Sequence, residues 1–219
     1  METILGDARK QEREYDWLGA VESYKKALDL VPEQDFFKMG EIYEQLGYAF
    51  YRAGMQAENM HEFRKRMSLA SANYEKAKEF YRSLSERGKA PRTFRCDAMI
   101  AYLKHWLMAE VPEKKRLLDE CWRLTKECLR AFEEAENAWE YGKTYNQLSN
   151  SAFFGFALEW DYQARKKIVK EAFEHGERAH ELLSTFGDPF ELARAYVRTA
   201  SYLQMFGFYF LDLDERQRY

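Results

Sequence analysis

The sequence predicts an all-α protein built from stacked helical repeats, and three observations carry that prediction. Apolar residues recur at spacings of three and four from end to end, and no stretch alternates strictly as a half-buried strand would. Aromatic residues recur every 51 positions, at Tyr43, Phe94, Tyr145 and Tyr196. Only four prolines interrupt 219 residues, 16% of which are aromatic, and this composition suits long helices packed through large side chains.

Small residues keep the same 51-residue period in two series: Ala70, Cys121 and Ala172, then Ala77, Cys128 and Ala179. A period of this size indicates a supersecondary unit that cannot bury its own apolar face and stacks on copies of itself. We therefore expect one elongated domain over residues 1–219. Cys121 and Cys128 are expected to be small core residues in a reducing cytoplasm.

Turn signals divide the chain into nine helices. Their predicted ranges are 3–15, 17–31, 36–53, 57–86, 91–109, 112–137, 139–159, 162–186 and 189–206. Pro112 and Pro189 open the sixth and ninth of them, where a missing N–H is harmless, and Asp188 suits the N-cap of the ninth. Small residues 51 positions apart mark where a neighbouring helix approaches closely: Gly47, Ala98, Ser149 and Ala200.

Two stretches carry a recognisable repeat motif, one around Asp16-Trp17, Ala20, Tyr24, Ala27 and Pro32, the other at Tyr43, Leu46, Gly47 and Phe50. Through these residues the chain resembles the tetratricopeptide-repeat superfamily. The resemblance implies a right-handed α-solenoid of about four and a half helical hairpins. The implied repeats span approximately 1–34, 35–87, 88–138, 139–187 and an incomplete 188–219. Since a standard repeat has about 34 residues, a 51-residue period lengthens each helix by two or more turns.

The last repeat stops where its second helix should begin, because residues 212–219 align with the start of the helix near Asp161. Repeat arrays normally close with a polar capping helix. We expect the chain to be part of a longer protein. The alternative is an end covered by another subunit, including self-association through the incomplete repeat.

Charge and hydropathy restrict the classes of partner. The net charge of −3 attracts neither nucleic acid nor an anionic membrane in bulk. The first thirty residues lack a secretory pattern, and the apolar stretches are far shorter than the roughly 20 residues that span a bilayer. We expect a cytoplasmic protein with no membrane partner.

A basic ladder is the sharpest candidate for a binding site. Arg92, Lys143 and Arg194 are 51 residues apart, and Arg95, Asn146, Asn150 and Arg198 lie within one or two helical turns of them. The resemblance places such residues on a concave groove, and family members that clamp carboxylates use a comparable Lys, Asn and Arg set. Arginine and asparagine suit a carboxylate or phosphate because both donate several hydrogen bonds. Glu41 interrupts the ladder at its first position, and a solvated helix face is the alternative interpretation.

Four basic triplets form a second series: 64–66, 114–116, 165–167 and 216–218. They could follow an acidic partner or a nucleic-acid backbone. Glu62 with Arg66, Arg116 with Glu120 and Lys167 with Glu171 are each four apart, however, as internal helix pairs are. Nucleic acid is therefore an unfavoured partner.

Catalysis, metal binding and cofactor binding find little support in the sequence. The four histidines are scattered, and Glu171 with His175 would supply only two ligands where zinc takes four. No glycine-rich phosphate loop or nucleophile motif is present. We expect no enzyme, no cofactor and no metal site.

The sequence thus favours a scaffold module that binds a protein or peptide, with an acidic or extended segment in the basic groove. The alternative is a sensor domain of a signalling or transcriptional regulator, which binds a small-molecule or peptide inducer.

Overall fold

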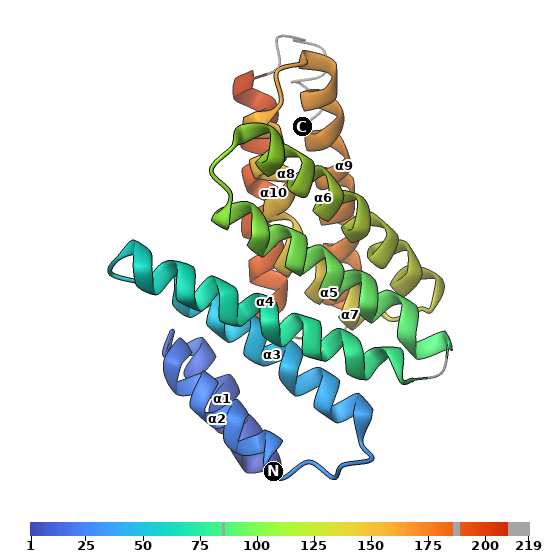
Figure 1. Cartoon of the computed structure of the whole chain (residues 1–219). Helices are drawn as coiled ribbons and strands as arrows, with labels where there is room; N and C mark the ends of the chain where they lie inside the picture. Colours follow the sequence, from blue (N-terminus) through green and yellow to red (C-terminus); the bar gives the residue numbers. More distant parts are fainter. Residues whose placement is uncertain (85, 186–188, 210–219) are drawn as a thin grey trace. The chain divides into compact units, whose positions relative to one another are not determined.

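A computed structural model describes residues 1–84, 86–185 and 189–209, and every regular element in these ranges is an α-helix (Figure 1). The all-α prediction is confirmed. The chain divides into two compact units, Met1–Ala109 and Glu110–Tyr219. Their boundary falls inside the third predicted repeat, and each unit is described below by itself.

The first unit contains five helices: α1 (Glu2–Arg13), α2 (Trp17–Leu28), α3 (Phe36–Met55), α4 (Met60–Arg82) and α5 (Glu86–Leu107). Each packs against the next one along the chain. α5 begins five residues earlier than predicted, so Pro91 lies inside it rather than at its start. The second unit contains α6 (Val111–Glu134), α7 (Ala138–Leu148), α8 (Asn150–Leu158), α9 (Tyr162–Ser184) and α10 (Pro189–Tyr209).

Short polar side chains fix most helix starts. Asp16, Asp35, Asn59, Asn137 and Asp161 each accept a hydrogen bond from the backbone N–H three residues later, at 2.7 to 3.2 Å. Such caps satisfy one of the donors that the first helical turn leaves without an internal partner. α6 lacks a side-chain cap and begins at Val111, one residue earlier than predicted, so Pro112 is its second residue and lies in the first turn, where a missing N–H is harmless. Asp188, the predicted cap of α10, lies outside the described residues.

Glycines on α3 pack against tyrosines on α4, so the two helices approach closely. A Cβ at Gly40 would lie 2.6 Å from the Tyr81 ring, and one at Gly47 would lie 2.7 Å from the Tyr74 ring. The two glycines are seven residues apart on α3, and the two tyrosines are seven residues apart on α4. Seven residues is the spacing at which two nearly antiparallel helices keep one face in contact. The prediction that Gly47 marks a close approach is confirmed.

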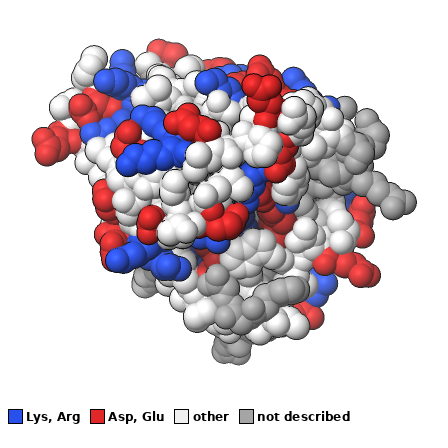
Figure 2. All heavy atoms as spheres, turned by 90° about the horizontal axis from the view of Figure 1, so that it is seen from below, with Lys and Arg blue, Asp and Glu red and all other residues white. Residues whose placement is uncertain are grey.

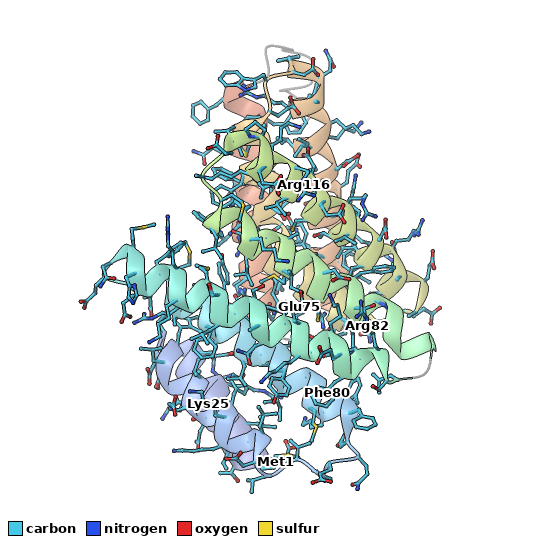
Figure 3. All side chains as sticks on the ribbon, in the orientation of Figure 1. Met1, Lys25, Glu75, Phe80, Arg82 and Arg116 are labelled. Carbon is cyan, nitrogen blue, oxygen red and sulfur yellow. The ribbon has the colours of Figure 1, made fainter. Side chains whose placement is uncertain are left out.

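The aromatic end of the same hairpin is formed by Phe80 on α4 (Figure 3), which stacks on Phe36 and Tyr43 of α3 at ring separations of 6.2 and 5.5 Å. Offset stacking of this kind adds to the stabilisation from burial.

The 51-residue period has a physical counterpart in the first unit. Tyr51 and Tyr102 are one period apart, and their hydroxyl oxygens lie 3.4 Å from each other. Glu44 and Arg95 are also one period apart and form an ion pair. Two periods after Gly40 and Tyr81, the second unit repeats the same small-to-large contact, with Leu183 2.5 Å from a Cβ at Gly142. Residues one period apart therefore contact each other within the first unit, and the glycine contact of the first unit recurs two periods later in the second.

One predicted helix, 139–159, is broken in two at Ser149. The Tyr202 hydroxyl donates to the Ser149 carbonyl and also hydrogen-bonds the Phe153 backbone. In a continuous helix the Phe153 N–H would donate directly to the Ser149 carbonyl, and the Tyr202 hydroxyl lies between these two groups instead. Insertion of a side chain into the helical ladder is a recognised cause of a kink.

Glu136 has a left-handed backbone conformation, with φ of 53°, in the turn between α6 and α7. Glycine adopts this conformation without the steric cost that a Cβ brings. We expect Glu136→Gly to raise the free energy of unfolding by about 0.5–1 kcal/mol. Urea unfolding of the wild type and the variant measures this, and a loss of stability would contradict it.

Within the described residues, no helix combines the length and the apolar character that a bilayer span requires. The three cysteines are free and buried, and burial raises the pKa of Cys121 to about 12. The core positions predicted for Cys121 and Cys128 are thus confirmed. Residues 210–219, which the sequence aligns with the start of a further helix, lie outside the described residues.

Candidate functional site

The predicted ladder residues of the first unit are buried. Arg95 is 0% exposed and forms a two-pronged ion pair with Glu44, with N–O distances of 2.8 and 3.0 Å. The Tyr81 hydroxyl donates to the same carboxylate at 2.8 Å. This burial corrects the expectation that Arg95 faces an open groove, because its guanidinium is enclosed by the protein's own core.

Arg92 is also buried, at 9% exposure. Its guanidinium lies over the Phe37 and Tyr81 rings, 4.7 and 5.6 Å from their centroids. A cation over aromatic faces contributes stability, and it leaves little surface for a partner.

The remaining five predicted residues lie in the second unit, and Glu191 of α10 joins two of them. The Asn146 amide donates to the Glu191 carboxylate at 2.6 Å and to its backbone carbonyl at 2.9 Å. Arg194 pairs with the same carboxylate at 2.8 Å. Asn150 accepts a hydrogen bond from Arg198. Lys143 is half-buried on α7.

The structure therefore brings Asn146, Arg194 and Glu191 together, and separately Asn150 with Arg198. These contacts join α7 and α8 to α10 inside the unit. Asn146 is 0% exposed, so this position, like Arg95, is corrected from a groove surface to the core. The sequence does contain one indication that Arg95 is paired internally, because Glu44 lies one period before it.

Each of the three basic triplets at 64–66, 114–116 and 165–167 has at least one residue that pairs with a neighbouring acid, and the triplet 216–218 lies outside the described residues. Arg66 pairs with Glu62, and Lys167 lies 4.0 Å from Glu171, as the four-residue spacing predicted. Arg116, in the second turn of α6 (Figure 3), instead pairs with Glu113 at 2.7 Å. On the face drawn in Figure 2, basic and acidic side chains are interspersed.

The outward side of α10 forms an exposed surface without charge. We call it the α10 face, and it consists of Ala193, Tyr196, Val197, Ala200 and Gln204. Tyr196 is 54% exposed and Val197 is 69% exposed. The five residues are spaced by three and four, so they line one side of the helix. The opposite side of α10 is buried through Ala195, Thr199, Tyr202 and Met205.

Four of the five residues that lie 51 positions before the α10 face are buried under neighbouring helices. Gly142, Tyr145, Asn146 and Ser149 correspond to the first four residues of the α10 face, and all four are buried. Leu183 of α9 and Glu191 of α10 cover two of them. The α10 face thus has the composition of a repeat-to-repeat contact, whereas exposed helical positions are usually charged or polar.

A pocket of about 120 Å³ lies between α6, α8 and α9. Leu118, Trp122 and Ala152 are buried around it, and three charged residues line it as well: Asp119, Arg123 and Lys126. Gly155 also lines it, and a Cβ built there would meet no atom within 4 Å.

Polar residues lie behind the Trp122 ring. Its indole N–H donates to Glu171 at 3.2 Å, and Lys126 pairs with the same carboxylate at 2.7 Å. His175, one turn along α9, lies 2.8 Å from the Tyr141 hydroxyl. Among the described residues, no group of three or more His, Cys, Asp or Glu side chains could hold a metal ion.

Burial lowers the pKa of His175 below its usual value of 6.5, although the Glu171 carboxylate opposes the shift. The unfolded chain then binds the proton more readily than the folded one, so stability is complete above about pH 6.5 and falls as the pH drops below it. We expect His175→Gln to flatten this dependence. Urea unfolding at pH 7.5, 6.5 and 5.5 measures it, and parallel curves for the wild type and the variant would contradict it.

Comparison with known proteins gives no relative: no family model matches the chain, and no curated protein matches it significantly. The tetratricopeptide resemblance consequently rests on the motif residues of the sequence alone.

Proposed function

We propose that the chain is a protein-interaction module of the helical-repeat class and that its α10 face binds an amphipathic helix of a partner protein. The observation that carries the proposal is the contrast within one register: Tyr145 and Asn146 are 0% exposed, whereas Tyr196 and Val197, one period later, are 54% and 69% exposed. A contiguous exposed surface of this kind is a common mark of a docking site.

The packing of α3 on α4 suggests the shape of the partner. There, Tyr74 and Tyr81 fill the places left by Gly47 and Gly40. Ala200 and Ala193 occupy the matching positions of α10, also seven residues apart. A partner helix with large apolar side chains at a seven-residue spacing would fit this surface as an amphipathic helix fits a groove.

The pairing of the basic ladder favours this apolar mode over capture of an acidic segment. Arg95 and Arg194 already hold Glu44 and Glu191. An acidic partner would have to displace these internal carboxylates, and leaving a buried charge without its partner is costly.

Affinity capture from the host lysate tests the proposal. We expect the double variant Ala193→Asp, Ala200→Asp to lose a partner that the wild type retains, because two charges would be buried in the contact. Ala72→Asp, at an exposed position of α4, is the matched control and should retain it. Equal capture by all three proteins would overturn the proposal.

A sensor domain that binds a small inducer is the second candidate, and the pocket beside Gly155 favours it. A ligand that binds only the folded state raises the melting temperature in a dose-dependent way. A thermal-shift screen therefore separates this candidate from a scaffold that has no small ligand.

A further inference from the structure

Every exposed residue of α10 between positions 189 and 208 is uncharged, so the uncharged side of this helix extends beyond the α10 face in both directions. Near its two ends, Phe190 and Phe208 are 44% and 73% exposed. The charged residues of the helix are Glu191, Arg194 and Arg198, which are half-buried and bonded within the unit. Since 32% of the chain is charged and exposed helical positions normally carry such residues, this side of α10 has the character of a contact surface.

Two series of exposed residues at a seven-residue spacing make up this side of the helix. The residues of the first series are the larger: Phe190, Val197 and Gln204. The residues of the second series are small: Ala193, Ala200 and Gly207. Each small residue comes three positions after a large one and four positions before the next, as the a and d positions of a coiled coil alternate. The helix therefore presents large and small residues alternately along one seam.

The contact of α3 with α4 shows how such a series of small residues is filled. A Cβ at Gly54 would lie 2.9 Å from the Met67 side chain, which adds a third layer to the two glycine–tyrosine contacts described above. From layer to layer the α3 position rises by seven and the α4 position falls by seven, because the two helices are antiparallel. The small residues of α10 stand three periods after these three glycines. α10 thus presents the small half of a contact whose large half, in the first unit, comes from an antiparallel helix.

A second copy of α10, placed antiparallel about a two-fold axis, supplies that large half. With the axis between positions 198 and 199, Val197 of each copy lies opposite Ala200 of the other. The same operation sets Ala193 opposite Gln204 and Phe190 opposite Gly207. Every layer then pairs a large residue with a small one, and the two-fold axis makes each contact twice, as in the commonest class of homodimer interface.

We propose that the chain forms a two-fold symmetric dimer in which α10 packs antiparallel on α10 of a second copy, with Val197 opposite Ala200. This inference rests on the proposed function, because it names the partner that binds the α10 face. The seam from Phe190 to Gly207 is about 26 Å long. One helix pair of this length makes an interface at the small end of the specific ones, so we expect a dimer Kd on the order of 10 µM.

Sedimentation velocity of the purified full chain, from about 1 to about 200 µM, measures the dimer directly. The wild type should change from monomer to dimer over this range. Val197→Glu and Ala200→Lys should each stay monomeric, because two like charges would be buried beside the two-fold axis. Ala72→Glu, at an exposed position of α4, is the matched control and should dimerise as the wild type does.

An equimolar mixture of the two charged variants tests which residues lie opposite each other. The carboxylate of Val197→Glu in one copy would lie opposite the ammonium of Ala200→Lys in the other. The second central layer of the mixed dimer keeps its wild-type alanine and valine. We expect the mixture to recover a dimer at least about tenfold tighter than either variant forms alone. This recovery would also show that both variants are folded.

A wild type that stays monomeric at the highest concentration, or a dimer that survives Val197→Glu, would overturn the pairing of α10 with a second copy. A mixture that stays monomeric would overturn the proposed alignment of the two helices. The proposed docking function is judged separately by capture from the host lysate. A monomeric wild type that still retains a partner, lost in Ala193→Asp, Ala200→Asp, would keep that function and assign the surface to a different protein, so the two failures are distinguishable.

Discussion

Replacing Glu44 with alanine is expected to lower the free energy of unfolding of the first unit by about 3–5 kcal/mol. The change leaves the Arg95 guanidinium at 0% exposure without its carboxylate and removes the acceptor of the Tyr81 hydroxyl. Removal of one member of a buried ion pair costs far more than removal of an exposed one, because the remaining charge stays out of water. Urea unfolding monitored by circular dichroism measures the loss.

Two variants separate this explanation from a general sensitivity of α3. Glu41→Ala, whose side chain is 32% exposed and 3.4 Å from Lys38, should cost less than about 1 kcal/mol. The double variant Glu44→Leu, Arg95→Leu should recover most of the loss, because an apolar pair can replace a buried ion pair at little cost. A loss at Glu44 as small as that at Glu41 would show that the ion pair is not a main support of the unit.

Gly47→Ala is expected to destabilise the first unit by about 1–3 kcal/mol. The new Cβ would lie 2.7 Å from the Tyr74 ring, and that ring is fully buried and cannot move aside. The cost appears despite the gain of about 1 kcal/mol that alanine brings over glycine in an open helix.

Gly6→Ala on α1 is the matched control, since a Cβ there would meet nothing within 4 Å. It should be neutral or stabilising under the same urea unfolding. A second test combines Gly47→Ala with Tyr74→Leu, which frees space and should be less destabilised than the sum of the two single variants. Similar stability of the Gly47 and Gly6 variants would contradict the close approach of α3 and α4.

The sequence predicted the helices well because their signals are local. Asp16 and Asp35 cap α2 and α3 where the predicted ranges begin, whereas the Asn59 cap starts α4 three residues later than predicted. The break at Ser149 was not predictable in the same way. Its cause is the hydroxyl of Tyr202, which is 53 residues away in the chain and reaches the site only through the packing of α10.

The surroundings of the candidate binding residues were harder to predict because the 51-residue period has two consequences. It aligns like residues, as in the ladder of Arg92, Lys143 and Arg194, and it also places Glu44 opposite Arg95. If the basic residues are interpreted only as like charges on one surface, their pairing with acidic residues inside the protein is overlooked. The α10 face was overlooked for a related reason, since Tyr196 keeps the register of the buried Tyr145 and only the structure shows its exposure.

The most direct test of the proposed docking function is site-specific photo-crosslinking. A photoreactive phenylalanine analogue replaces Val197 in one protein and Lys170, an exposed residue of α9, in a matched control. After irradiation in the host lysate, we expect adducts at position 197 that map to one helical segment of a partner, or of a second copy, with large apolar residues seven positions apart. The two added charges of Ala193→Asp and Ala200→Asp should abolish these adducts. Equal, unspecific adducts at both positions, or adducts that persist in the charged variant, would contradict the assignment of the α10 face as a docking surface.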